Sequence, residues 1–385
     1  MNLVGSAVAL ARLGVESTIF TTDMAEAPNA KSRRHIEAAD LPEHAEEVDI
    51  RIFPVTRGGA RLAISPALSR ALRREISNYD VVHVHMLFLH STFAAYRAAL
   101  DADVPYIVSP CGALEPNLRH RSRRAKALWE VLWQRTMMNR AAAIHYKTPQ
   151  EAEGTRDFGY ISPQVVVPNG IFWDEFQGSV DDHALRRHGL NRDEPIVLFL
   201  GRISHVKGLE ILIPAFARVP ARHRARLVIA GPDDEGLVPG LANLAATCGV
   251  GDRVVFTGTL RGAERLAALG AARAWVLPSR TENFGQAVIE ALAAGAPVIV
   301  SPEVNLAEEL SAAGAAWVVE RDHEALAEAM SILLCDARAR ARLETLGREF
   351  AARYDWSYVA PQLKSMYQAA ASWRVGATEA ASAAA

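Results

Sequence analysis

Two segments in the second half of the chain carry residues whose types and spacing suit anion binding. The first is PIVLFLGRISHVKGLEILIPAF, residues 195–216. A buried strand is expected to end at Gly201 and a helix to begin near residue 207, which places Arg202 and Lys207 beside a helix N-terminus. Free backbone N–H groups, the helix dipole and two cations favour an anion at such a place. Gly201 would also let a ligand approach the backbone closely. The pattern predicts a phosphate site, and the alternative is two solvated cations in an ordinary loop.

The second segment is WVLPSRTENFGQAVIEALAAGAPVIVS, residues 275–301. A strand is expected to end at Pro278, and the polar loop SRTENFG leads into a helix from about Gly285. Glu282 lies in the loop, and Glu290 lies eight residues later on the second turn of the helix. Both carboxylates can accept hydrogen bonds from sugar hydroxyls, and the first N–H groups of the helix, from residue 283 to residue 286, face the same edge. The alternative is a helix-start acid that complements the dipole and a solvated surface acid.

Short β-branched runs alternate with helical patterns along most of the chain, and these elements would position both segments. One set of expected strands covers residues 17–21, 48–53, 81–85, 106–109, 142–146 and 165–167, and a second set covers 196–200, 226–230, 253–257, 274–277, 297–300 and 315–319. Helical patterns at 66–77, 209–219, 285–294 and 323–334 are examples of what separates them. Such alternation predicts parallel sheets covered by helices on both faces.

The two sets of strands predict two doubly wound, Rossmann-like domains that face a cleft. The turn signal Pro168–Asn169–Gly170 separates an N-terminal domain, 1–170, from a C-terminal domain, 171–356. A terminal helix at 357–371 is expected to pack back on the first domain, and residues 373–385 are expected to be a disordered tail. The chain opens with a helix, whereas a doubly wound domain opens with a strand. We therefore expect the first strand of the N-terminal domain to be missing.

Composition excludes several classes of protein. Of the 385 residues, 50% are hydrophobic and 22% are charged, which is a globular balance, and the net charge of −2 offers no global field for nucleic acid. The three cysteines show no zinc-ligand spacing, and we expect no metal site. No basic leader and no membrane-spanning apolar run is visible. We expect a cytoplasmic protein, and contact with the inner face of the membrane stays open.

With these motifs in view, the chain resembles retaining glycosyltransferase family 4, also called glycosyl transferases group 1, which has the GT-B fold. GRISHVKG resembles the family's G-R-x(4)-K-G motif, and TENFGQAVIEALAAGAPVI resembles its E-x(7)-E motif with the helix and strand that follow. IAGPDDEG and VVFTGTL resemble the segments between them, and VVVPNGIFWDEF resembles the hinge between the domains. The likeness covers residues 1 to about 370 and is most specific in 195–301.

The resemblance implies roles for these residues. Arg202 and Lys207 would hold the diphosphate of a nucleotide-sugar donor, a UDP- or GDP-sugar above all, and Glu282 would contact the donor sugar. These three are the expected catalytic residues. Glu290 would contact the ribose. The expected donor-binding set is completed by the backbone of Gly201, Asn283, Phe284 and Gly285. The family implies retention at the anomeric carbon, no bound cofactor and no metal.

The first half would bind the acceptor, a glycan or a lipid-linked molecule. DVVHVHML, residues 80–87, resembles the family's D-x-x-H-x-H stretch, and strand alternation puts His83 and His85 on one face. We expect His85 and Gly112 on the acceptor side; the alternative for His85 is a hydrogen-bonded core histidine. SPCGALEPNL resembles a loop that often reads P-H-G in the family, and Cys111 replaces that histidine here.

The segment from Arg119 to Arg135 begins basic and continues as an amphipathic pattern with two tryptophans. Cations beside tryptophan suit an anionic lipid surface, and the resemblance implies a peripheral membrane contact through this domain. The alternative is a solvated first turn followed by core tryptophans.

The resemblance implies a glycosyltransferase, and it favours one of surface polysaccharide, lipopolysaccharide or glycolipid biosynthesis. A non-catalytic relative that binds a nucleotide sugar and a sugar-nucleotide 2-epimerase of the same architecture are the alternatives. A nicotinamide dehydrogenase is disfavoured, because no G-x-G-x-x-G follows a strand.

Overall fold

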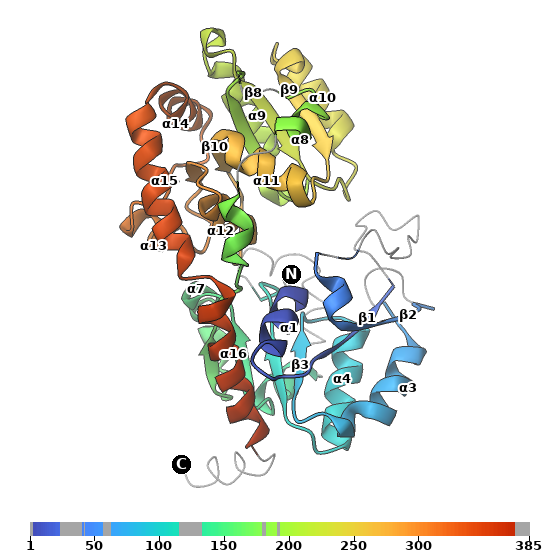
Figure 1. Ribbon diagram of the computed structural model, residues 1–385. Coiled ribbons are helices and arrows are strands. Elements are labelled where there is room, and N and C mark those ends of the chain that lie inside the picture. The colour runs from blue at the N-terminus through green and yellow to red at the C-terminus, as the bar shows by residue number, and fades with distance from the viewer. Residues whose placement is uncertain are drawn as a thin grey trace. The chain divides into compact units, whose positions relative to one another are not determined.

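The computed structural model describes residues 3–23, 41, 43–56, 63–114, 133–178, 182–190 and 193–373. The chain divides into two compact units (Figure 1). One combines Met1–Gly170 with Trp356–Ala385, and the other is Ile171–Asp355. All paired strands are parallel.

The second unit is a six-stranded sheet with helices packed along it. Its strands are β7 (Ile196–Leu200), β8 (Arg226–Ala230), β9 (Val254–Gly258), β10 (Ala272–Leu277), β11 (Val298–Val300) and β12 (Trp317–Val318). Its helices are α8 (Asp182–Arg186), α9 (Leu209–Arg218), α10 (Val238–Thr247), α11 (Gly262–Ala271), α12 (Gln286–Ala293), α13 (Ala307–Ala312), α14 (His323–Cys335) and α15 (Ala337–Ala352). The strands β7, β8, β10 and β11 consist largely of buried apolar residues, as expected for a sheet covered on both faces, whereas the edge strand β9 is mostly half-buried.

The strand order of this sheet is β12-β11-β10-β7-β8-β9. The first strand, β7, is therefore central, with β8 on one side and β10 on the other. Right-handed crossovers put α9 and α10 on one face and α12 and α13 on the other, because the order runs outward in opposite directions from β7. The place where the order reverses, between β7 and β10, is where open α/β sheets bind ligands.

The first unit contains two smaller sheets. Its strands are β1 (Thr18–Thr22), β2 (Asp49–Phe53), β3 (Val82–His85), β4 (Tyr106–Ser109), β5 (Ala143–Tyr146) and β6 (Gln164–Val166). Its helices are α1 (Leu3–Ala11), α3 (Pro66–Glu75), α4 (His90–Asp101), α6 (Arg135–Asn139), α7 (Pro149–Glu153) and α16 (Trp356–Ala371). Fully buried Tyr106, Ile144 and Tyr146 lie in its core. The last helix, α16, lies beside α1, at the other end of the chain (Figure 1).

The sequence predicts one sheet for the first set of strands, and the structure differs. The strands pair as β1-β2 and as β3-β4-β5-β6. Within the described residues, no named strand pairs with the second edge of β1 or of β3.

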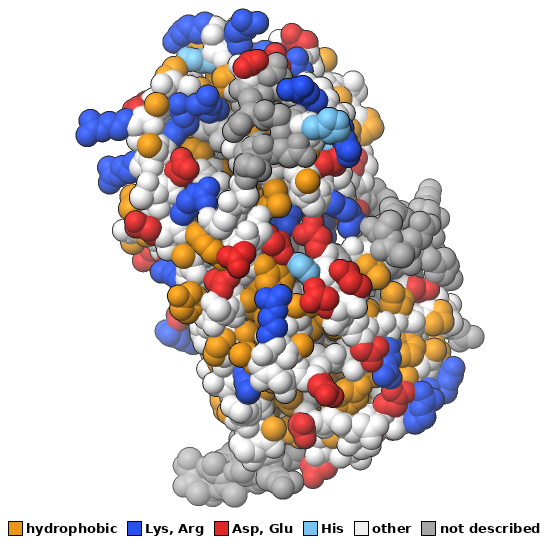
Figure 2. Space-filling view, viewed as in Figure 1, with side chains coloured by type: hydrophobic (Ala, Val, Ile, Leu, Met, Phe, Trp, Pro, Cys, Tyr) orange, Lys and Arg blue, Asp and Glu red, His pale blue; other side chains and the backbone are white. Residues whose placement is uncertain are grey.

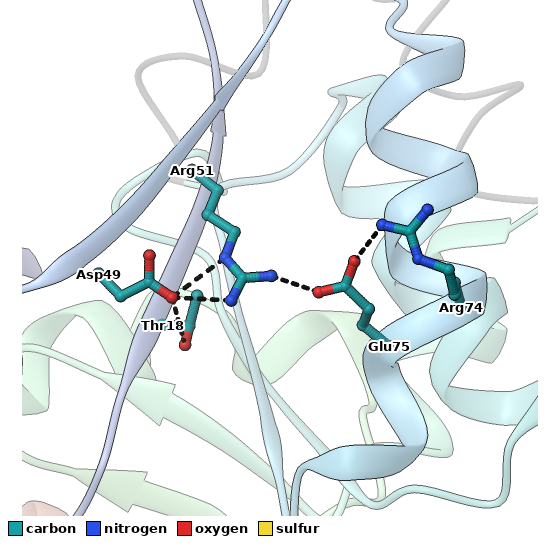
Figure 3. Close-up of polar contacts among 5 residues, drawn as sticks. All are labelled: Thr18, Asp49, Arg51, Arg74 and Glu75. Atoms are coloured by element: carbon teal, nitrogen blue, oxygen red, sulfur yellow. Dashed lines mark hydrogen bonds and ion pairs between the residues drawn. The ribbon is translucent and has the colours of Figure 1, made fainter.

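Polar side chains join the small β1-β2 sheet to α3 (Figure 3). The Arg51 guanidinium donates from its Nε and Nη2 to the Asp49 carboxylate at 3.0 and 2.9 Å, and it reaches Glu75 on α3 with its Nη1. Thr18 of β1 donates to the same Asp49 oxygen at 3.3 Å. Because Arg51 and Asp49 are exposed, these contacts orient the side chains but add little to the free energy of folding.

Two expectations fall wholly or largely outside the described residues. The proposed disordered tail is described only at Trp373, and of the segment from Arg119 to Arg135 only residues 133–135 are described. There the Trp133 ring packs edge-on against Phe93 at 5.5 Å and is 38% exposed.

Candidate functional site

The two chemistry-bearing loops lie at the same edge of the second unit's sheet. Arg202 and Lys207 follow β7, and Glu282 follows β10. These strands are hydrogen-bonded neighbours, with Trp275 in register with Leu198. Their carboxyl ends therefore bring both loops to the point where the strand order reverses.

Backbone contacts join the two loops directly. The Arg280 N–H donates to the Val206 carbonyl at 2.7 Å, and the Ser279 hydroxyl lies 3.0 Å from that same carbonyl. Gly208, with φ +75°, caps the start of α9. A Cβ on Gly208 would lie 2.0 Å from the Pro278 carbonyl oxygen, so no side chain fits there. The glycine of the K-G pair in the first motif is thus explained by its close packing on the end of β10.

At the centre of this edge Lys207 and Glu282 form an ion pair. The Lys207 Nζ donates to Glu282 Oε2, and the two side chains are only 15% and 18% exposed. The loop after β11 fixes the backbone of Glu282, whose N–H donates to the Glu303 carbonyl at 3.2 Å and whose carbonyl accepts from Asn305 N–H at 3.0 Å. A cation and a carboxylate from different strands are therefore held together in a partly dry setting. Arg202 is exposed at the same edge.

Glu290 has a different partner. The Arg265 Nη1 on α11 donates to Glu290 Oε2 at 2.7 Å, and its Nη2 lies 3.6 Å from Glu175 Oε2. The guanidinium also lies over the Phe176 ring, 5.5 Å from its centroid. Arg265 and Glu290 are 14% and 17% exposed, so the carboxylate is held in one orientation by a largely buried cation.

The remaining residues of the expected donor set supply backbone. Gly201 donates to the Ala230 carbonyl at 2.9 Å, and a Cβ added to it would meet only Phe199 at 3.7 Å. Gly285, with φ +72°, begins α12. The Asn283 Oδ1 lies 3.4 Å from Asn305 Nδ2. The Phe284 ring is buried and packs edge-on against Tyr354 at 5.7 Å, so only the backbone of Phe284 remains for a ligand.

The expected acceptor-side residues lie in the first unit, at the carboxyl ends of β3 and β4. The His83 and His85 ring centroids are 3.9 Å apart, which agrees with the prediction that they share a face. The His85 Nδ1 lies 3.9 Å from the Cys111 sulfur. The Gly112 N–H donates to Glu151 Oε1 at 2.6 Å. That N–H already donates to Glu151 and is therefore not available as a hydrogen-bond donor to a ligand.

Several residues of these sites are absent from the motifs. Arg265 is 25 residues from its partner Glu290, and Glu151 is 39 residues from Gly112. Lys147, which is buried in the first unit, also lies outside the sequence motifs. A capping signal marks Glu151, since Thr148 caps α7 by accepting from the Glu151 N–H. For Arg265 no local pattern exists, because its position depends on how α11 and α12 pack.

Within the described part of the chain, no group of three or more His, Cys, Asp or Glu side chains is arranged to hold a metal ion. No described helix is long and apolar enough to cross a membrane. Acidic and basic side chains are both scattered over the face seen in Figure 2, in keeping with the small net charge.

Comparison with protein-family models matches both halves of the chain. Residues 181–350 match the model described as glycosyl transferases group 1. Residues 4–170 match the model described as glycosyl transferase 4-like domain.

Known proteins resemble the chain over most of its length. It is 30% identical to a D-inositol 3-phosphate glycosyltransferase of Xylanimonas cellulosilytica, over 93% of this chain and 88% of that protein. Among solved structures, sucrose-phosphate synthase from Thermosynechococcus elongatus has a TM-score of 0.71 and 25% identity, covering 94% of this chain and 91% of that one. Anabaena HepE, in complex with UDP and glucose, has a TM-score of 0.74 and 17% identity, covering 91% and 99%, and shows a shared fold.

Proposed function

We propose a specific transfer reaction for this chain, which belongs to the glycosyl transferases group 1 family and is therefore a glycosyltransferase with the GT-B fold. It moves a sugar from a UDP- or GDP-sugar to a hydroxyl acceptor, with retention at the anomeric carbon. Arg202, Lys207 and Glu282 carry the reaction, and Glu290 binds the ribose. The observation that carries this proposal is the Lys207–Glu282 pair at the reversal of the strand order.

The geometry supports a specific division of labour. An ammonium has three donors, and Glu282 uses one of them, so Lys207 can also hold a phosphate oxygen. Arg202 lies on the same loop, and the first N–H groups of α9 lie at the same edge. Negative charge grows on the diphosphate as the bond to the sugar breaks. Fixed cations and N–H groups stabilise that charge more than the ground state, which lowers the barrier.

Glu282 is placed to connect the two parts of a donor. Its Oε2 binds the ammonium that holds the phosphate, which leaves its other oxygen to accept a hydrogen bond from a sugar hydroxyl. The sugar is thereby oriented relative to its leaving group, which is the positioning that catalysis of group transfer requires.

The donor site is tested by thermal shift with UDP, GDP, ADP, CMP and dTDP, on the wild type and on Arg202→Ala and Glu290→Ala. A ligand that binds only the folded state raises the melting temperature. We expect one nucleotide, UDP or GDP, to stabilise the wild type, and its effect to shrink in both variants. A shift of equal size in all three proteins would place the nucleotide elsewhere.

The transferase reaction is tested against the competing functions by product analysis. Free nucleoside diphosphate should appear only when an acceptor is present. Release without an acceptor, together with an epimerised sugar, would favour the 2-epimerase. Binding without turnover of any donor–acceptor pair would favour a non-catalytic relative. The anomeric coupling constant of the product's new linkage, read by proton NMR, tests retention, and full activity in excess EDTA tests our proposal that no metal is needed.

The biological setting follows from the same proposal. We place the enzyme in the cytoplasm, in the synthesis of a surface polysaccharide, lipopolysaccharide or glycolipid, with an acceptor that is a glycan or a lipid-linked molecule. The relative from Xylanimonas is named for a phosphorylated inositol acceptor, which makes a small phosphorylated polyol a further acceptor to test.

A further inference from the structure

A chain of neutral histidines lies in the first unit, next to the carboxyl ends of β3 and β5. The His145 Nε2 lies 2.8 Å from the Val167 carbonyl, which can only accept, so this nitrogen carries the proton. The His145 Nδ1 then carries a lone pair, and it accepts a hydrogen bond from His83 Nε2–H at 3.2 Å. His83 Nδ1 in turn accepts from the Tyr367 hydroxyl at 2.8 Å. The hydrogen bonds thus assign both tautomers without a charge on either ring.

Burial supports this assignment. It lowers the pKa of His145 to about 3 and the pKa of His83 far below its usual value. The His85 pKa is lowered in the same way, first by burial and then by Lys147. Every imidazole in this cluster is therefore neutral near pH 7.

Lys147 lies against this cluster with its hydrogen-bond donors largely unused. Its Nζ is 3.4 Å from His145 Nδ1 and 3.3 Å from His145 Nε2. Nearly equal distances to both nitrogens put the ammonium over the face of the ring, away from the single lone pair, which His83 already occupies. Over the described residues, these are the ammonium's polar contacts. An ammonium with three donors and no oxygen acceptor is incomplete.

The Glu151 carboxylate beside this cluster accepts hydrogen bonds from two backbone N–H groups. Glu151 accepts from the Gly112 N–H at 2.6 Å through Oε1 and from the Lys147 backbone N–H at 2.8 Å through Oε2. It clamps the turn after β4 onto the end of β5, and this turn contains Cys111 with φ +52°, a conformation rare for residues with a side chain. Glu151 thus fixes the loops around Lys147, and its charge partly offsets the effect of burial on the Lys147 pKa.

A cavity beside the Lys147 ammonium has room for one small group of a ligand. A small cavity, lined by Lys147, His83, His85, His145 and Asn169, adjoins the ammonium. It has space for about one water-sized group. The cavity can therefore take one oxygen of a ligand, while the rest of the ligand lies outside it. Lys147 is 8% exposed, so part of this residue reaches solvent.

We propose that Lys147 binds a phosphate group of the acceptor, with one phosphate oxygen in the cavity and the neutral imidazoles of His83, His85 and His145 around it. An anionic oxygen supplies the acceptor that the ammonium lacks, and it recovers part of the cost of keeping a cation out of water. Lysine suits a phosphate as a compact point charge. That the phosphate belongs to the acceptor rests on the proposed function; the anion site does not.

The site is tested by labelling the wild-type protein with acetic anhydride at pH 8, with and without inorganic phosphate. Burial lowers the pKa of Lys147 to about 8, so a large fraction of this amine is neutral and reactive at that pH. Peptide mass spectrometry measures the labelling rate of each lysine. We expect phosphate to slow labelling of Lys147 about tenfold at saturation, since a bound anion both covers the amine and raises its pKa.

Lys364 is the internal control, because it lies in the same unit and its Nζ donates to the Leu13 carbonyl at 2.7 Å. Its labelling should not respond to phosphate. An unchanged Lys147 rate with phosphate present would overturn the proposal, and so would a Lys147 that stays unlabelled under both conditions, because no ligand could then reach it.

The source of the phosphate and its link to transfer are read from two further measurements. Labelling in the presence of myo-inositol phosphate, and separately of phosphatidylinositol vesicles, tells a soluble acceptor from a lipid headgroup by which one protects Lys147. With a protecting acceptor, Lys147→Met should raise the KM for that acceptor about tenfold and leave the donor KM unchanged. Equal KM values would exclude the acceptor role. A wild type without any transfer would refute the proposed function, and the labelling result would stand by itself.

Discussion

At the scale of single residues, the Lys207–Glu282 pair combines two motif residues that lie 75 positions apart. The motifs predict that both lie at the ligand edge, because each follows a strand. They do not predict the pairing, which depends on β7 and β10 being neighbours. The sequence motifs thus identified Lys207 and Glu282 as site residues, and only the fold shows that they form an ion pair.

Removing the Lys207 charge should act on the chemical step. We expect Lys207→Ala to lower kcat about 100- to 1000-fold, the usual loss when one fixed donor to a developing anion is removed. Steady-state kinetics with the nucleotide sugar found by thermal shift measures this. Arg280→Ala is the matched control, since Arg280 lies on the neighbouring loop but pairs with Glu210 at 2.7 Å. Equal losses in both variants would mean that general charge, not position, matters.

Arg265 should act through Glu290. We expect Arg265→Met to raise the donor KM about tenfold with little change in kcat, because a charge-assisted hydrogen bond that orients the carboxylate is lost. The affinities for the nucleotide and for its 2′-deoxy form should also become more alike in Arg265→Met. Arg265→Lys should restore part of the difference between these two affinities. Glu175→Gln, which changes the weaker 3.6 Å contact to Arg265, is the control. Unchanged discrimination in Arg265→Met would disprove the positioning role.

At the scale of elements, the periodic patterns predicted the strands well. Those at 106–109, 196–200 and 226–230 match β4, β7 and β8 at both ends. The strand expected at 315–319 is reduced to Trp317–Val318, the two residues that pair with β11 at the edge of the sheet. Pairing between strands is a tertiary property, so the division of the first set into two sheets could not be read from its alternation.

Gly208 connects an element boundary to the site. We expect Gly208→Ala to lower the free energy of unfolding by about 2 kcal/mol or more, since it adds a steric clash with the Pro278 carbonyl to the strain of a positive φ. Urea unfolding measures the change. Gly249, with φ +70° and nothing within 4 Å of an added Cβ, is the control, and Gly249→Ala should cost only about 1 kcal/mol. Equal costs would show that the close approach to Pro278 relaxes freely.

At the scale of the whole molecule, the neutral histidine cluster should make stability depend on pH. The folded pKa of His145 is about 3, whereas an unfolded imidazole titrates near 6.5. Between these values the unfolded chain binds more protons, so the free energy of unfolding falls as the pH falls below about 6.5. His145 alone would account for about 2 kcal/mol at pH 5, and His83 and His85 shift in the same direction.

Urea midpoints at pH 7.5 and pH 5 check this expectation. The wild type should lose much more stability between the two values than His145→Asn, whatever their absolute stabilities. His205→Asn is the control, because the His205 side chain is 78% exposed. An equal loss of stability in His145→Asn and the wild type would mean that His145 does not contribute to this pH dependence.

The return of α16 to the first unit has a consequence for how the protein is made. Tyr367 completes a hydrogen bond to His83, and Lys364 one to Leu13, each across more than two hundred residues of chain. Ile171–Asp355 is continuous and can fold as soon as it leaves the ribosome. The first unit is discontinuous, so its contacts with α16 form only after the whole of the second unit has been translated, although domains usually fold in the order of their synthesis. Until α16 has been made, the α1 surface that it covers lacks this partner.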